Sequence, residues 1–222
     1  MKPFQVATLI LLVVNGMALG DPDVAPVPRL GTAPSTSAWT IAYQYQTPNP
    51  YLKPPDPSQA AVYEKLRNLY PRLVSINVIK SADRRKEVLQ LDNQTESIRW
   101  IEGKLLGWQN LKLNTFVISD ATSPGVTPFN HDFDSLSWID QADYKGHQSY
   151  QGVDCCVYHS TATPQGEQTA YIEAKSGLPV GVQQNGVTLH YVFMPSNESV
   201  QFPPDVEARF KEYLTVNPNP NR

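Results

Sequence analysis

Short runs of alternating apolar and polar residues, separated by tight turns, recur through most of this 222-residue chain and constrain its fold more than any other feature. Trp39, Ile41 and Tyr43 alternate with smaller or polar neighbours, which is the period of a strand with one aromatic face. Comparable runs cover residues 74–78, 84–91, 97–101, 104–108, 112–119, 144–150, 153–161, 168–173, 179–184 and 187–193. Asn185-Gly186, between the last two, is the strongest hairpin signal. Successive hairpins of this kind predict an antiparallel meander.

Two segments have the periodicity of helices instead. After Pro57, the residues Val62, Leu66 and Leu69 form one apolar stripe, and Pro71 ends the segment. Near the C-terminus, Pro203-Pro204 opens a second helix, as early prolines often do. The apolar positions of this second helix are Val206, Phe210, Tyr213 and Leu214.

Residues 120–140 are rich in Pro, Asn and Asp and have no regular period. They contain Phe133, Leu136 and Trp138, so we expect part of the segment to pack against the sheet, with a helical turn near residues 135–139.

Together these elements predict an α+β fold that is mainly β: a strongly curved antiparallel meander sheet, or half-barrel, packed around the inserted helix and a C-terminal helix. We expect the stripe of the inserted helix to lie in the hollow of the sheet. The predicted ligand cavity consists of Trp39, Ile41, Tyr43, Val62, Leu66, Trp100, Tyr191 and Phe193. The alternative is that the same side chains form a solid core.

The N-terminus predicts export. Lys2, the apolar run from Val6 to Val14 and the small residues Ala18-Leu19-Gly20 are typical of a cleaved signal peptide over residues 1–20. No cysteine follows the run, so a bacterial lipoprotein anchor is not expected. The remaining chain divides into a proline-rich, poorly ordered leader (21–37), one domain (38–216) and a frayed tail (217–222). We expect the protein in the periplasm or outside the cell, peripheral to a membrane at most.

Charge and composition exclude one class of partner. The formal net charge is −3, and the sequence has no block rich in Lys and Arg. Both observations argue against nucleic acid as the main partner. We expect a monomer.

The two cysteines, Cys155 and Cys156, are adjacent. Their Cα atoms lie about 3.8 Å apart, whereas a disulfide usually requires roughly 4.4 Å or more. Neighbouring side chains in a strand also point to opposite faces. We therefore favour two free thiols, one of them buried and one on the other face, and keep a strained vicinal or cross-chain disulfide as the alternatives.

Polar residues gather in Asn130-His131-Asp132-Phe133-Asp134. Carboxylates and a histidine can ligate metals, so a hydrolase or metal enzyme using His131, Asp132 and Asp134 is one hypothesis. The spacing matches neither an EF-hand nor a zinc-enzyme motif, and such residues are common in turns. The sequence has no nucleophile elbow or phosphate loop, and no Cys–His pairing is implied by spacing. We therefore predict no enzyme, no metal and no cofactor.

Two sequons, at Asn93 and Asn197, lie at predicted turns and matter only in a eukaryotic secretory pathway.

The second half of the chain resembles a known family. Its residues Gly146 to Gly152, Asp154 to Tyr158, Ala170-Tyr171-Ile172-Glu173 and Ser176-Gly177-Leu178-Pro179-Val180 follow the order of motifs in the LolA-like lipoprotein-carrier superfamily. The chain is also similar to uncharacterised exported bacterial proteins with a proline-rich start. The resemblance implies a half-barrel around helices, with a hydrophobic cavity that accepts lipid or acyl chains.

The sequence thus leads to one hypothesis and one rival. The hypothesis is a non-enzymatic, exported carrier that holds a lipid or a lipoprotein acyl chain between sheet and helix. The rival is a cell-envelope interaction or scaffold protein with a solid core and no ligand cavity.

Overall fold

The computed structural model describes residues 30–120, 132–163 and 166–218. Its strands are β1 (Thr36–Tyr45), β2 (Leu73–Ser81), β3 (Arg84–Leu91), β4 (Glu96–Glu102), β5 (Leu105–Asn110), β6 (Thr115–Asp120), β7 (Tyr144–Tyr150), β8 (Val153–Thr163), β9 (Gly166–Glu173), β10 (Pro179–Gln184) and β11 (Val187–Met194). The α-helices are α1 (Ala60–Leu69) and α2 (Pro204–Val216), and the short 3₁₀ helices are η1 (Pro57–Gln59), η2 (Asp134–Leu136) and η3 (Gln141–Asp143).

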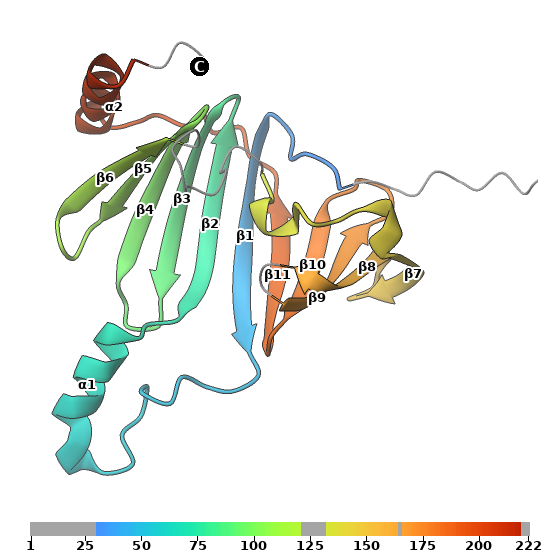
Figure 1. Ribbon diagram of the computed structural model, residues 1–222, viewed down its shortest axis with the longest axis horizontal. Coiled ribbons are helices and arrows are strands. Elements are labelled where there is room, and N and C mark those ends of the chain that lie inside the picture. Colours follow the sequence, from blue (N-terminus) through green and yellow to red (C-terminus); the bar gives the residue numbers. More distant parts are fainter. Residues whose placement is uncertain (1–29, 121–131, 164–165, 219–222) are drawn as a thin grey trace, which may run out of the picture.

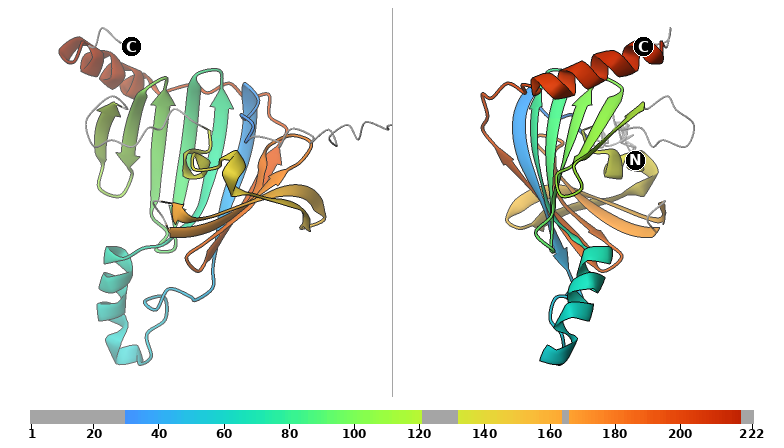
Figure 2. Two further views of the ribbon diagram at one scale, coloured as in Figure 1. Left: turned by 45° about the vertical axis from the view of Figure 1, so that its right-hand side comes forward. Right: turned by 90° about the vertical axis from the view of Figure 1, so that its left-hand side faces the viewer.

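The described strands form one antiparallel sheet in the order β6-β5-β4-β3-β2-β1-β11-β10-β9-β8-β7. β1 lies at its centre and separates two meanders, one running out to β6 and one returning from β7. The sheet is strongly curved and open (Figures 1 and 2). The predicted meander and half-barrel are confirmed, because a sheet of this many strands accumulates twist and bends.

The outer, convex face of β4 to β6 is covered by α2 and the segment leading to it. Phe210 of α2 and Phe202 are buried, and their rings lie 5.5 Å apart. The Phe202 ring lies 5.4 Å from the ring of Trp100, and the Phe210 ring lies 6.5 Å from that of Phe116. The predicted C-terminal helix is confirmed, and Val206 and Phe210 of its apolar side are buried, whereas Leu214 is 38 % exposed. This outer cluster fixes α2 across one end of the sheet (Figure 2).

The predicted place of α1 is wrong. The helix forms where expected, but it projects away from the end of the sheet instead of lying in its hollow (Figures 1 and 2). Val62 is 57 % exposed and Leu69 is 69 % exposed, and no residue of α1 is buried.

The short link between α1 and β2 explains this position. Asp92, in the β3–β4 turn, accepts hydrogen bonds from the backbone N–H of Arg72 at 3.0 Å and from the side-chain amide of Asn49 at 2.7 Å. Asn49 is buried and also donates to the carbonyl of Tyr70 at 3.2 Å. The link is therefore fixed at the end of the sheet, so α1 cannot turn back over the inner face.

The predicted leader is ordered in its last part. Gly31 N–H donates to the carbonyl of Gly177 at 2.7 Å, and the carbonyl of Ser35 accepts from Ala82 N–H at 2.7 Å. Ala33 is 4 % exposed. Residues 30–37 thus pack on the sheet, whereas the predicted signal peptide and the rest of the leader lie outside the described residues.

Gly107 of β5 lets α2 approach the sheet closely. A Cβ atom at Gly107 would lie 2.6 Å from ring atoms of both Phe116 and Phe210. We predict that Gly107→Ala lowers the free energy of unfolding by about 1–3 kcal/mol, since the outer cluster has to move apart. Urea unfolding measures the change. Gly103→Asn is the matched control, because nothing lies within 4 Å there and Asn accepts the φ of +55°. Equal stability of the two variants would contradict this packing.

Candidate functional site

The inner, concave face of the sheet carries an aromatic cluster, defined here as Trp39, Phe133, Tyr191 and Phe193. β-strand register places Trp39 directly opposite Phe193, and their rings stack at 5.7 Å. Phe133 lies 5.8 Å from Trp39, 6.0 Å from Phe193 and 6.1 Å from Tyr191, measured between ring centroids. Trp39 and Phe133 are buried. The cluster joins the central strands to the segment that follows β6.

That segment, residues 132–139, is the cover of the inner face beside β1 (Figure 1). Leu136 of η2 is fully buried in the same core as the aromatic cluster. Trp138 packs against this core and donates its indole N–H to Gln168 Oε1 at 3.0 Å. The hydroxyl groups of Ser135 and Tyr191 lie 3.4 Å apart. The sequence-based expectation that this irregular segment packs on the sheet is confirmed, and it takes the place predicted for α1.

The structure brings together most of the predicted cavity residues but not all of them. Trp39, Ile41, Tyr43, Tyr191 and Phe193 belong to the inner core. The other three lie elsewhere: Trp100 belongs to the outer cluster under α2, and Val62 and Leu66 lie on α1. The predicted cavity therefore cannot lie between the sheet and α1, because α1 does not face the sheet.

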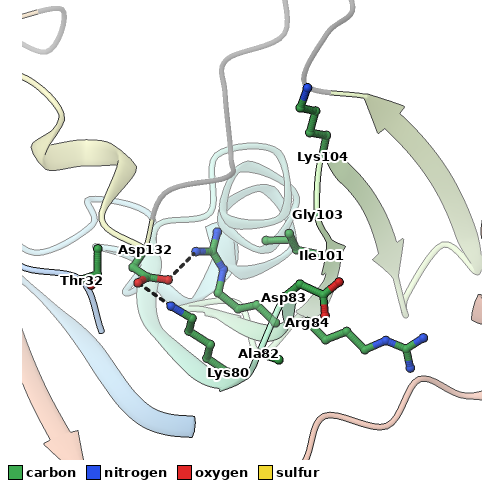
Figure 3. Close-up of a pocket in the computed structure, with 10 residues that line it drawn as sticks. Thr32, Lys80, Ala82, Asp83, Arg84, Ile101, Gly103, Lys104 and Asp132 are labelled. Atoms are coloured by element: carbon green, nitrogen blue, oxygen red, sulfur yellow. Dashed lines mark hydrogen bonds and ion pairs between the residues drawn. The ribbon is translucent and has the colours of Figure 1, made fainter. Parts of the chain in front are cut away.

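An ion-pair network crosses the inner face next to the aromatic cluster, and Figure 3 shows its part around Asp132. Asp132 lies 2.7 Å from Lys80 Nζ and 3.6 Å from an Arg85 nitrogen. Its carboxylate also accepts from Ala33 N–H at 2.9 Å. The Glu87 carboxylate lies 2.9 Å from Arg85 and 3.3 Å from Arg99. The network holds the start of the covering segment against β2 and β3.

A pocket of about 430 Å³ opens beside this network. Its lining is Thr32, Lys80, Ala82, Asp83, Arg84, Arg85, Ile101, Gly103, Lys104 and Asp132. Four of these side chains are cationic and two are acidic, and Lys80, Arg84 and Arg85 are each paired with a carboxylate. Such a charged lining suits a polar group better than an acyl chain.

The structure describes only some of the residues on which the metal-enzyme hypothesis depends. Asp132 pairs with Lys80, whereas His131 and the side chain of Asp134 lie outside what the structure describes. Among the described residues, no three His, Cys, Asp or Glu side chains are grouped so that they could hold a metal ion.

Farther along the inner face, at β5 and β6, apolar side chains are exposed. Trp108 is directly opposite Val117 in the ladder, and the two are 45 % and 60 % exposed. Register places both on the same face as Arg99, whose guanidinium lies 5.1 Å from the Trp108 ring centroid. Leu106 lies on the same face and is partly buried. We call Leu106, Trp108 and Val117 the open apolar patch.

The cysteines are free and on opposite faces, as predicted, and both are buried. The β7–β8 register brings His147 opposite Cys156, with Sγ and Nε2 3.5 Å apart, and His147 Nδ1 lies 3.4 Å from Asp154 Oδ1. Only the hairpin register, and not residue spacing, reveals this Cys–His contact. Burial raises the pKa of the Cys156 thiol, which keeps it protonated and poorly nucleophilic.

Burial also raises the pKa of tyrosines in the interior. The pKa of Tyr191 and that of Tyr158 each rise to about 12, mainly through desolvation. The pKa of Tyr43 is raised for the same reason. The phenols stay neutral, so the inner face around the aromatic cluster remains apolar at neutral pH.

No described helix is long and apolar enough to cross a membrane. A comparison of the sequence with family profiles finds no match, and neither does a comparison with curated proteins.

Solved structures give distant likenesses. An uncharacterized conserved protein from Thermus thermophilus is 12 % identical with a TM-score of 0.46, covering 76 % of this chain and 87 % of its own. The Mycobacterium tuberculosis lipoprotein LppX is 11 % identical with a TM-score of 0.39, covering 75 % and 88 %. A candidate outer membrane lipoprotein-sorting domain from Vibrio parahaemolyticus is 7 % identical with a TM-score of 0.35, covering 81 % and 92 %.

One of these descriptions, the lipoprotein-sorting domain, names the class of protein that the sequence motifs resemble. At these identities and TM-scores, however, the function has to be argued from the geometry of this chain.

The raised tyrosine pKa values predict loss of stability in alkali. Tyr191 and Tyr158 titrate near 10 when unfolded but at about 12 when folded, so the unfolded state loses protons first as pH rises. Stability is therefore full below pH 10 and falls as pH rises from 10 to 12. Absorbance at 295 nm, recorded with near-ultraviolet circular dichroism, should show these phenols ionising together with loss of tertiary structure. Ionisation of all 11 tyrosines near pH 10, in a protein that keeps its native structure, would contradict this prediction.

The anchoring role of Asp132 predicts a second effect. Asp132→Asn removes the charge that faces Lys80 and Arg85, so we expect a loss of about 2 kcal/mol in the free energy of unfolding. Hydrogen exchange should become faster in residues 133–139 before it changes in β1. Glu198→Gln, at an exposed position, is the control. Unchanged exchange in this segment would show that the ion pairs do not hold it.

Proposed function

We propose that this chain binds a hydrophobic ligand, such as a lipid or the acyl group of a lipoprotein, on the inner face of its sheet and catalyses no reaction. The observation that carries the proposal is the apolar character of both parts of that face: the aromatic cluster under the covering segment and the open apolar patch. Exposed apolar side chains on a concave surface are typical of sites that bind apolar groups.

The covering segment can give way to a ligand without breaking the sheet. Phe133 and Leu136 contact the inner core through side chains, and η2 makes its own hydrogen bond, from Leu136 N–H to the Phe133 carbonyl at 2.8 Å. An acyl chain that replaced these side chains on Trp39 would exchange one apolar contact for another, at little cost in buried area. A ligand that reached from the aromatic cluster to the open apolar patch would cross the Arg85–Glu87 ion pair, so its polar end would lie there.

Two polar features favour a ligand with a polar end. The indole N–H of Trp39 is buried and donates to no acceptor within the described part of the chain. A buried donor of this kind usually has a partner, and an ester or carboxyl oxygen of a lipid would supply one. The pocket beside Lys80 and Arg85, lined by charged side chains, would accommodate a polar headgroup.

The remaining parts of the proposal concern place and chemistry. The signal peptide predicted over residues 1–20 would deliver the protein to the periplasm or the outside of the cell. The neutral Cys156 thiol supports a binding role, because nucleophilic catalysis requires a thiolate.

A second candidate is an interaction protein of the cell envelope with a solid core. It is favoured by the exposed apolar side chains of α1, which cover nothing in the described structure. Native mass spectrometry with lipid extraction, on protein purified from its own envelope, separates the two. Stoichiometric lipid supports the carrier, and its absence supports the interaction protein.

A pair of matched valine variants locates the ligand. Val117 on the inner face and Val192 on the outer face are 60 % and 55 % exposed strand residues. We predict that Val117→Asp weakens binding of a fluorescent fatty acid at least about tenfold, since a carboxylate cannot be desolvated beside an acyl chain. Val192→Asp should leave binding unchanged. Displacement titrations measure both affinities, and equal effects of the two variants would place the ligand elsewhere.

A further inference from the structure

The end of the molecule formed by α1 and the β5–β6 turn has an exposed apolar surface. We call it the docking end and define it as Val62, Leu66 and Leu69 of α1 with Leu111 and Leu113 of the turn. The three α1 residues are spaced by four and three positions and so share one side of the helix. One flank of this stripe is occupied: the ring of Tyr51, in the preceding loop, lies 6.2 Å from Tyr63 and 5.8 Å from Tyr70, two residues about 80–100° around the helix from Val62.

Hydrogen bonds join the helix to the turn. Asn68 Oδ1 accepts from Lys112 Nζ at 3.0 Å and from the Asn93 side-chain amide at 3.3 Å. Leu111 and Leu113, on either side of Lys112, are 46 % and 67 % exposed. Helix and turn project from the same end of the sheet in both views (Figures 1 and 2). The exposed leucines of the helix and of the turn therefore lie at the same end of the molecule.

The charges next to this surface are cationic. Lys65 follows Val62 by three residues and borders the apolar stripe. Lys112 contacts Asn68, which lies beyond Lys65, about 120° around the helix from Val62. Neither lysine pairs with a carboxylate within the described residues. Glu64 lies on the far side of the helix from Val62, about 40° beyond Asn68.

Four cations of the sheet differ in this respect. Each has a carboxylate partner at 2.7 to 3.3 Å. These cations are Lys80, Arg84, Arg85 and Arg99.

We propose that the docking end binds the surface of a bilayer that contains anionic lipids. Leucines on a convex tip can enter the boundary between headgroups and acyl chains, while lysines at the border reach the phosphates. A second copy of this chain fits less well. A two-fold interface would place the same patch against itself and bring the lysines of the two copies together. The proposal does not rest on the ligand site of the inner face.

Vesicle binding tests the proposal with the purified protein. Mixed phosphatidylcholine–phosphatidylglycerol vesicles should bind it, pure phosphatidylcholine vesicles should bind it more weakly, and high salt should weaken the first interaction. Leu69→Gln with Leu113→Gln should lower the partition coefficient at least about tenfold. Lys65→Gln with Lys112→Gln should lower it about fivefold per lysine on the anionic vesicles alone.

The controls distinguish this surface from the rest of the molecule. Val192→Gln with Met194→Gln changes two outer-face residues of similar exposure, 55 % and 46 %, and should leave vesicle binding intact. Val117→Asp should also leave it intact, and the leucine variant should still bind the fatty-acid probe. The melting temperature of the leucine variant should stay close to that of the unsubstituted protein, because both side chains are exposed.

Three results would overturn the proposal. They are no binding to either kind of vesicle, binding that the leucine variant retains in full, and a dimer in sedimentation that the leucine variant dissociates.

Discussion

The pairing of β1 with β2 on one side and β11 on the other organises the whole structure. It joins two local meanders into a single curved sheet and aligns Val78, Trp39 and Phe193 across three strands of the inner face. An apolar row at the centre of an open sheet has to be covered, since leaving it in water is unfavourable. Residues 132–139, after β6, supply that cover, and in the proposed function a ligand of the inner face would have to displace them.

The strands and α2 follow from the sequence because their signals are local. Period-two alternation marks each strand, and the positions of Val206 and Phe210 mark the buried side of α2. The position of α1 could not be predicted from the sequence. Its stripe shows which side of the helix is apolar but not what lies against that side. The decisive contacts come from Asn49 and Asp92, polar residues outside the helix.

Register accounts for the other differences at the site. Trp39 and Trp100 both occupy apolar positions of strands, yet the ladders through β2 and β3 put them on opposite faces. Alternation alone cannot fix this, because one residue more or less in a turn reverses the face. For the same reason, the sequence did not predict that Arg85 and Glu87 point to the inner face, since charged residues in a strand are normally assigned to the solvent side.

The charged network gives the inner face its particular chemistry. Arg85 and Glu87 are 7 % and 8 % exposed, and burying such groups is unfavourable unless they are paired. They separate the aromatic cluster from the open apolar patch, so a wholly apolar ligand would have to pass over charges. An amphiphile, with its polar end at the network and its chain on an apolar part, is the ligand class that suits this arrangement.

A crystal structure of the protein with a brominated fatty acid tests this account most directly. The account predicts an anomalous bromine peak on the concave side, between Trp39 and Trp108, with the carboxylate towards Lys80 or Arg85. A peak on the convex side, in the groove where Phe116 meets Tyr213 of α2, would contradict it.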